Sequence, residues 1–245
     1  MPVPSDWIEP DWPAPHRVKA LVTTRNGGVS QGPYASLNLG IRVGDDAHAV
    51  SENRARVRAL LPSEPKWLRQ VHGLDVVQAD RVTVEATADA AFTRQAGVVC
   101  AVQSADCLPV LLCDREGASV AIAHAGWRGL SAGVLENAVA ALDRAPEELI
   151  AWLGPAIGPG KFEVGLDVFE AYTVADPAAI LAFEPLREGK WLADLYALAR
   201  RRLSRAGVTA VFGGGLCTVS DPVRFFSHRR DRVTGRQGAF IWIAA

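Results

Sequence analysis

The sequence lacks the long apolar segments that mark membrane and secreted proteins. No apolar run among its 245 residues approaches the roughly 20 that a membrane-spanning helix requires. The N-terminal stretch MPVPSDWIEPDWPAP holds prolines and acidic side chains where a secretory signal would have an apolar core. We therefore expect a cytoplasmic protein with no membrane partner.

Cysteine is scarce and its spacing is irregular. The four cysteines form no CxxC pair, so they predict neither a disulfide framework nor a local zinc-binding pattern. Cys100 and Cys113 lie inside apolar runs and Cys217 begins another, so we expect all three to be buried, unpaired core residues. Cys107 differs, because the motif ADCLP interrupts the apolar run around it.

Neither sign of charge dominates, since 26 basic and 27 acidic residues leave a formal net charge of −1. This balance argues against nucleic acid as a partner, although four arginines cluster between residues 229 and 236. No low-complexity linker or internal repeat divides the chain. With 49% hydrophobic residues the sequence can form a sizeable core, in one large domain over residues 1–245 or in two small ones.

Short apolar runs alternate with segments of helical spacing. Strands are predicted over 17–24, 67–71, 75–79, 98–102, 110–113, 119–123, 208–212, 217–219 and 239–243, and helix end followed by strand over 147–153. Helices are predicted over 46–60, 131–143, 164–174 and 192–206. We expect 67–71 and 75–79 to pair around His72-Gly73, and Pro109 to break its strand's ladder. The alternation predicts an α/β or α+β fold with a mixed sheet.

Three reactive side chains stand where apolar runs give way to turns, and Asp106 precedes one of them. They are His72, Cys107 and His124. If all three bind a metal, they do so from separate loops, and three ligands with an open fourth position would indicate a catalytic zinc. A metal-free nucleophile–base pair of Cys107 and His124 is the alternative interpretation of the same residues.

Several polar residues are weaker candidates. Arg128 lies just before a predicted helix N-terminus and would suit an anion such as phosphate, although a solvated loop arginine is the simpler interpretation. His228 follows an aromatic pair within a polar cluster. Asn38 lies in a glycine-rich loop, where asparagine is usually a turn residue.

A series of motifs in fixed order resembles the YfiH family, also called the laccase-domain or polyphenol-oxidase family. The motifs are RNGGVSQGPYASLNLG, ENR, RQVHG, SADCLPVLL, AHAGWRG, GPAIGP and FFSHRRD followed by TGRQ. The resemblance runs from about Lys19 to Ile243. It implies a single α/β (α+β) sandwich with mixed β-sheets, related to the deamidase domains of cytotoxic necrotizing factors.

The resemblance also implies a function. The family's metal ligands match His72, Cys107 and His124, and its members are regarded as zinc-containing purine nucleoside phosphorylases. The implied reactions are phosphorolysis of adenosine, guanosine and inosine, release of adenine from methylthioadenosine, and deamination of adenosine. Purine nucleoside and phosphate would be the partners of a monomer or homodimer. In one departure, Gly160-Lys161 stands where relatives often carry a cysteine pair.

On this reading we expect Asp106 to act as acid or base or to orient a ligand. Arg128, with Arg25 or a C-terminal arginine, would hold phosphate. Asn38 and His228 would contact the nucleoside.

Three rival functions remain open. A copper polyphenol oxidase of the multicopper type needs about ten histidines, many in HxH pairs, whereas this sequence has five and no HxH. Copper binding would then be adventitious. A metal-free cysteine hydrolase, such as a muropeptide-editing enzyme, would use Cys107 and His124. A non-catalytic binding protein with a structural zinc is the third.

Overall fold

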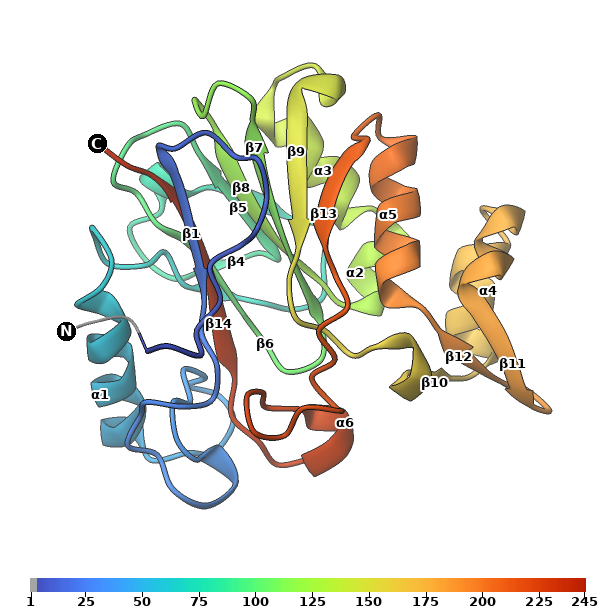
Figure 1. The fold of residues 1–245 in the computed structure, drawn as a ribbon, viewed down its shortest axis with the longest axis horizontal. Coiled ribbons are helices and arrows are strands. Elements are labelled where there is room, and N and C mark those ends of the chain that lie inside the picture. Colours follow the sequence, from blue (N-terminus) through green and yellow to red (C-terminus); the bar gives the residue numbers. More distant parts are fainter. Residues whose placement is uncertain (1–3) are drawn as a thin grey trace.

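A six-stranded mixed sheet forms the centre of the fold, in a computed structural model that describes residues 4–245 (Figure 1). Its strand order is β13 (Ala210–Gly213), β9 (Leu149–Leu153), β7 (Leu108–Asp114), β8 (Val120–Ala125), β5 (Ala90–Thr93) and β3 (Val76–Gln78). The central strand β7 runs antiparallel to β8 and β9, while the pairs β13–β9 and β3–β5 are parallel.

Both faces of the central sheet are covered. All residues of β7 and β8 are buried, which explains why these strands are continuous apolar runs rather than alternating ones. Along β7, Val110 and Leu112 pack with helices α2 (Trp127–Ala132), α3 (Val134–Leu142) and α5 (Leu195–Arg205) on one face. Leu111 and Cys113 point to the opposite face.

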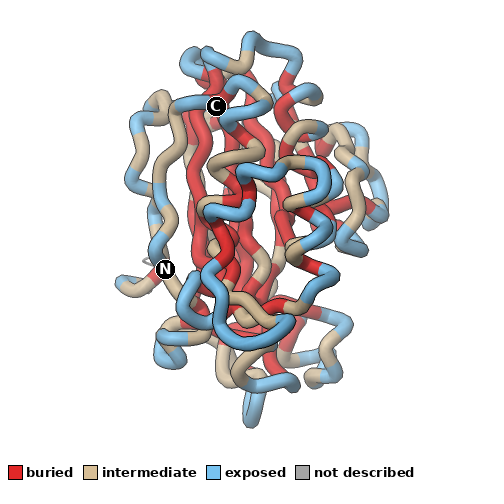
Figure 2. Tube along the Cα trace, turned by 90° about the vertical axis from the view of Figure 1, so that its right-hand side faces the viewer, coloured by how far each residue is buried: buried red, intermediate tan, exposed pale blue. Residues whose placement is uncertain are grey.

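That opposite face carries a second, antiparallel sheet. Its order is β1 (Val18–Val22), β14 (Gln237–Ile243) and β6 (Cys100–Ser104). Buried segments gather in the interior of the fold, while many connecting segments at its periphery are exposed (Figure 2). The predicted α/β sandwich with mixed sheets is therefore confirmed.

Smaller elements surround the sandwich. Helix α1 (Ala47–Arg58), capped by Asp46, covers part of the second sheet through Val57. A three-stranded sheet of β10 (Glu163–Val164), β12 (Lys190–Ala193) and β11 (Phe183–Arg187) lies to one side with α4 (Leu166–Thr173). The short elements β2 (Leu68–Arg69), β4 (Ala86–Thr87) and α6 (His228–Asp231) complete the regular structure used below. No helix in the part of the chain described here is long and apolar enough to cross a membrane.

Two predictions about strand pairing were wrong. The segments over 67–71 and 75–79 do not pair with each other: β2 pairs with β4 and β3 with β5, both in parallel. His72, at φ 60°, therefore lies in a link between two sheets rather than in a hairpin. Pro109 does not end its strand but lies inside β7, where its carbonyl accepts a hydrogen bond from Gly154 N at 2.9 Å.

Two predicted elements have different bounds. The helix expected over 131–143 begins at Trp127 and is interrupted at Gly133, whose φ of 116° only glycine adopts readily. The segment 217–219 is a turn, with a single isolated bridge between Cys217 and Ala156. By contrast, α5 ends just before Gly207, at φ 90°, as predicted.

Candidate active site

Three segments far apart in the sequence bring His72, Cys107 and His124 together. His72 lies in the link between β2 and β3, Cys107 in the turn between β6 and β7, and His124 near the end of β8. One ligand atom of each lies within 4.8 Å of the other two, and His72 Nε2 is 3.7 Å from Cys107 Sγ. The predicted convergence is thus present in the structure, although His124 belongs to a strand rather than to a loop.

Asp89, which the sequence analysis missed, organises this group. Its fully buried carboxylate accepts hydrogen bonds from the backbone N–H groups of Val71 (3.0 Å), His72 (3.0 Å) and Gly73 (2.6 Å). The same carboxylate bonds Nδ1 of His124 at 2.8 Å. Nδ1 of His124 is therefore occupied, so Nε2 is the nitrogen left for a ligand.

Gly126 allows the turn after β8 to pack directly against the group. A Cβ at this position would lie 2.7 Å from Cδ2 of His72 and 3.0 Å from Sγ of Cys107. Any side chain here would displace His72 or Cys107, so the close packing at the site requires the glycine of the AHAGWRG motif.

The charges of the group favour a reactive thiolate. Burial by itself would raise the pKa of Cys107, but His124 and His72 outweigh it through positive charge and hydrogen bonding and lower that pKa below its usual range. For His124, burial would lower the pKa, but the Cys107 thiolate and the Asp89 hydrogen bond raise it above the usual range. The pair is therefore stabilised as thiolate and imidazolium when no metal is bound.

The residues fit a zinc ion. Two imidazoles and one thiolate form a borderline-to-soft donor set that zinc prefers. Nitrogen and sulfur ligands of a tetrahedral zinc are about 3.6 Å apart, close to the 3.7 Å between His72 Nε2 and Cys107 Sγ. The carboxylate behind His124 is the usual partner of a metal-bound histidine.

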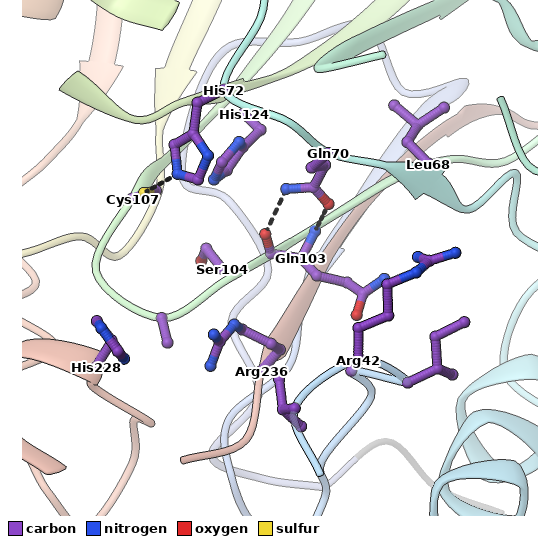
Figure 3. A pocket seen from close by; sticks show the side chains of 14 residues that line it. Arg42, Leu68, Gln70, His72, Gln103, Ser104, Cys107, His124, His228 and Arg236 are labelled. Carbon is purple, nitrogen blue, oxygen red and sulfur yellow. Dashed lines mark hydrogen bonds between the residues drawn. The ribbon is translucent and has the colours of Figure 1, made fainter. Parts of the chain in front are cut away.

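A polar cavity of about 350 Å³ opens beside the group (Figure 3). Besides the three candidate ligands, its polar lining includes Gln70, Gln103, Arg42, His228 and Arg236. Gln70 and Gln103 bond each other, through Gln70 Nε2 to Gln103 O and Gln103 N to Gln70 Oε1, both at 2.8 Å. Their mutual pairing fixes this wall of the cavity.

Arg236 is the arginine that reaches into the cavity on the side of Cys107 and His228 (Figure 3). It is half-buried, and burial lowers its pKa. Its side chain donates through Nη1 to the carbonyls of Thr234 (3.1 Å) and Gly235 (2.9 Å). Its Nε and Nη2 donors make no hydrogen bond within residues 4–245, so they remain for a ligand.

Three predicted substrate-binding residues, Arg25, Asn38 and Arg128, do not line the polar cavity. Arg25 donates to the carbonyls of Ala35 and Pro222 and stacks over Phe226, so it joins loops rather than lining the cavity. Asn38 is fully buried and accepts hydrogen bonds from the backbone of Gly40 and Arg236, both at 2.9 Å.

Arg128 is exposed, and its guanidinium stacks over the Trp127 ring at 4.3 Å.

His228 does line the cavity, and its Nδ1 bonds Arg232 O at 2.7 Å. A carbonyl can only accept, so Nδ1 of His228 carries the proton and Nε2 is the free ring nitrogen.

Asp106 holds the turn that presents Cys107. Its backbone has φ 93°, a conformation that costs energy for a residue other than glycine. Its carboxylate accepts hydrogen bonds from Thr218 Oγ1 and from Arg229 N, each at 2.6 Å. The side chain therefore connects the Cys107 turn to the segment that carries His228.

The other cysteines are free, as expected. Cys100 and Cys113 are fully buried, and burial raises both pKa values, that of Cys113 to about 12. Cys217 is half-buried rather than buried, because it lies in a turn where its sulfur accepts a hydrogen bond from Gly158 N at 3.3 Å.

Comparisons with known proteins agree with the family that the motif order indicates. A family model described as multi-copper polyphenol oxidoreductase laccase matches residues 19–244. The chain belongs to this laccase-like family. Within it, the chain is 55% identical over 238 residues to a purine nucleoside phosphorylase of Pseudomonas aeruginosa, covering 97% of this chain and 98% of that protein. It is 52% identical to the purine nucleoside phosphorylase YfiH of Escherichia coli, covering 98% and 99%.

Solved structures of the family show the same fold. A crystal structure of a Neisseria meningitidis protein superposes with a TM-score of 0.96 at 52% identity, covering 98% of this chain and all of that one. The crystal structure of YlmD from Geobacillus stearothermophilus gives 0.88 at 34% identity, covering 94% and 93%.

Proposed function

We propose that the protein is a zinc-dependent purine nucleoside phosphorylase in which His72, Cys107 and His124 hold the metal. The observation that supports this most is the convergence of these side chains at the wall of a cavity that also contains an arginine with free donors. The names of the relatives point to the same reaction.

The reaction is a displacement at C1′ of the ribose. An oxygen of phosphate forms a bond to C1′ while the bond from C1′ to N9 of the purine breaks. The electron pair of that bond goes to the purine, which takes up a proton, and ribose 1-phosphate is the second product. The site must therefore hold a phosphate anion and supply a proton to the departing base.

Arg236 holds the phosphate in this proposal, in place of Arg128 and Arg25. A guanidinium that presents Nε and Nη2 matches two phosphate oxygens. Asn38 supports Arg236 by accepting the hydrogen bond of its backbone N–H at 2.9 Å. The exposed Arg128 stacks instead over the Trp127 ring.

His228 is the proposed proton donor to the departing purine. Its Nδ1 is fixed by the Arg232 carbonyl, so Nε2 is the atom that gains and releases a proton. Asp89 keeps His124 in one tautomer and orients the loop of His72.

A zinc ion held by the three ligands would supply a Lewis acid, and water bound to it would ionise near pH 7. The same pocket would then support deamination of adenosine as a second activity. We propose adenosine, guanosine, inosine and methylthioadenosine as substrates, and the cytoplasm as the place of action.

A metal-free cysteine hydrolase is the second candidate, because the lowered pKa of Cys107 also suits a nucleophile. A multicopper oxidase has less support, since the structure gathers a single three-ligand cluster of histidine and cysteine among residues 4–245.

Product analysis distinguishes these functions. Adenosine incubated with the protein should give adenine and ribose 1-phosphate only when phosphate is present, and inosine should accumulate if deamination also occurs. Adenine formation that is independent of phosphate would indicate a hydrolase and contradict the proposal.

A further inference from the structure

A second, mostly apolar cavity lies directly beyond Cys107 and His228. It has a volume of about 160 Å³ and shares Ala105, Cys107 and His228 with the polar cavity. From this shared edge the polar cavity extends toward Arg42 and β2, whereas the second cavity extends toward α2 and α5.

The walls of the second cavity are largely hydrocarbon. Trp127, Ile157, Phe162 and Leu195 contribute apolar surface to it. The Trp127 indole has the Arg128 guanidinium stacked over it at 4.3 Å, which covers one face and holds the ring in place. A flat aromatic ligand that stacks on the indole ring suits such walls.

One charged acceptor faces this apolar space. Asp106 lines the cavity, and each of its carboxylate oxygens already accepts one hydrogen bond, from Thr218 Oγ1 and from Arg229 N. A carboxylate has about four acceptor positions, so each oxygen can take a further N–H donor. Purines present N–H groups at their edges that Asp106 can accept, whereas the carboxylate repels the negative charge of phosphate. Arg229 also lines this cavity, but its guanidinium donates to Glu163 O at 2.9 Å and lies over the Phe162 ring.

We propose that the apolar cavity is the purine compartment and that Arg236 marks the phosphate compartment on the other side of the Cys107–His228 edge. This inference rests on the proposed phosphorylase function and deepens it. C1′ of the ribose then lies at the shared edge, with phosphate entering from the polar cavity and the purine leaving into the apolar one. His228 lines both cavities, and a leaving base at the shared edge needs a proton there.

Two substitutions test the purine compartment and the phosphate compartment separately. Trp127→Ala should raise the KM for nucleoside and weaken binding of free adenine and hypoxanthine roughly 5- to 150-fold, because a stacked base is lost. The KM for phosphate should stay within about twofold of the original value. Arg236→Gln should do the reverse, raising the KM for phosphate while free adenine binds as before. Trp12→Ala, which removes a half-buried indole away from both cavities, is the matched control.

A measurement on the unaltered protein tests the purine compartment without depending on whether the variants fold. Adenine titrated into protein with labelled methyl groups should shift the Ile157 and Leu195 methyl resonances through the ring current of the purine. Inorganic phosphate should leave those resonances in place.

Different results would overturn the purine compartment and the phosphorylase function. Phosphorolysis with an unshifted Ile157 methyl group and unchanged adenine binding in Trp127→Ala would overturn the purine compartment alone. Adenine binding at Trp127 without any phosphate-dependent turnover would overturn the phosphorylase function and leave a purine-binding cavity.

Discussion

The Asp89 carboxylate bonds Nδ1 of His124 at 2.8 Å and also accepts three backbone N–H groups around His72. One buried side chain therefore positions two of the three candidate zinc ligands. In the proposed zinc site, metal affinity would therefore depend on a residue that is not itself a ligand.

Asp89→Asn should weaken zinc binding roughly 10- to 100-fold, because the amide cannot accept all four hydrogen bonds. Zinc affinity measured by competition with a chelator gives the readout. Asp114→Asn is a matched control, since Asp114 is also buried and accepts backbone N–H groups, from Glu116 and Ala118, in another loop. If both variants lose stability but neither loses zinc affinity, Asp89 has only a structural role.

Gly126→Ala should abolish zinc binding, because its Cβ would lie 2.7 Å from Cδ2 of His72 and 3.0 Å from Sγ of Cys107. Gly160→Ala, where a Cβ has no neighbour within 4 Å, should bind zinc normally. Metal content after gel filtration compares the two variants. Full zinc occupancy in Gly126→Ala would show that the three ligands do not meet at this point.

The pH dependence of alkylation should reveal the coupled pair in zinc-free protein. Since the pKa of Cys107 is lowered, iodoacetamide should still modify it below pH 8.5, the ordinary pKa of a free cysteine. As the pH falls through the folded-state pKa, the thiolate is protonated and both reactivity and its contribution to stability are lost. Peptide mapping should find the buried Cys100 and Cys113 unmodified. Equal labelling of Cys107 and Cys113 at neutral pH would contradict the assignment.

Substitutions of Arg236 and of Arg128 should change the KM for phosphate to different extents. Arg236→Gln should raise the KM for phosphate at least tenfold, because about 1.5–3 kcal/mol of charge-assisted hydrogen bonding is lost. Arg128→Gln should leave that KM nearly unchanged, because Arg128 is exposed and stacked on Trp127. The opposite ranking would restore Arg128 as the phosphate ligand.

The sequence was sufficient for the central strands and the candidate ligands. Strands β7 and β8 are short, continuous apolar runs whose type follows from their length and composition, and helix α1 follows from its Asp46 cap and its spacing. The three ligands stand at the ends of such runs and within family motifs, so their convergence could be predicted without knowledge of the pairing.

The features that the sequence could not predict depend on contacts between segments that are distant along the chain. Strands β2 and β4 have two residues each, and their parallel pairing carries no periodic signal. Asp89 gains its role only from the loop of His72 and from β8, although a lone acid among small apolar residues was a visible signal. Arg128 matched a local anion-binding pattern, but the neighbouring Trp127 ring holds its guanidinium.

Zinc titration into metal-free protein, with phosphate-dependent adenosine cleavage followed at each step, tests the zinc phosphorylase most directly. We predict that adenine and ribose 1-phosphate formation rises linearly with zinc and saturates at about one ion per chain. Cys107→Ala should neither bind zinc nor cleave adenosine. Full phosphorolysis in metal-free Cys107→Ala protein would contradict the role of this site.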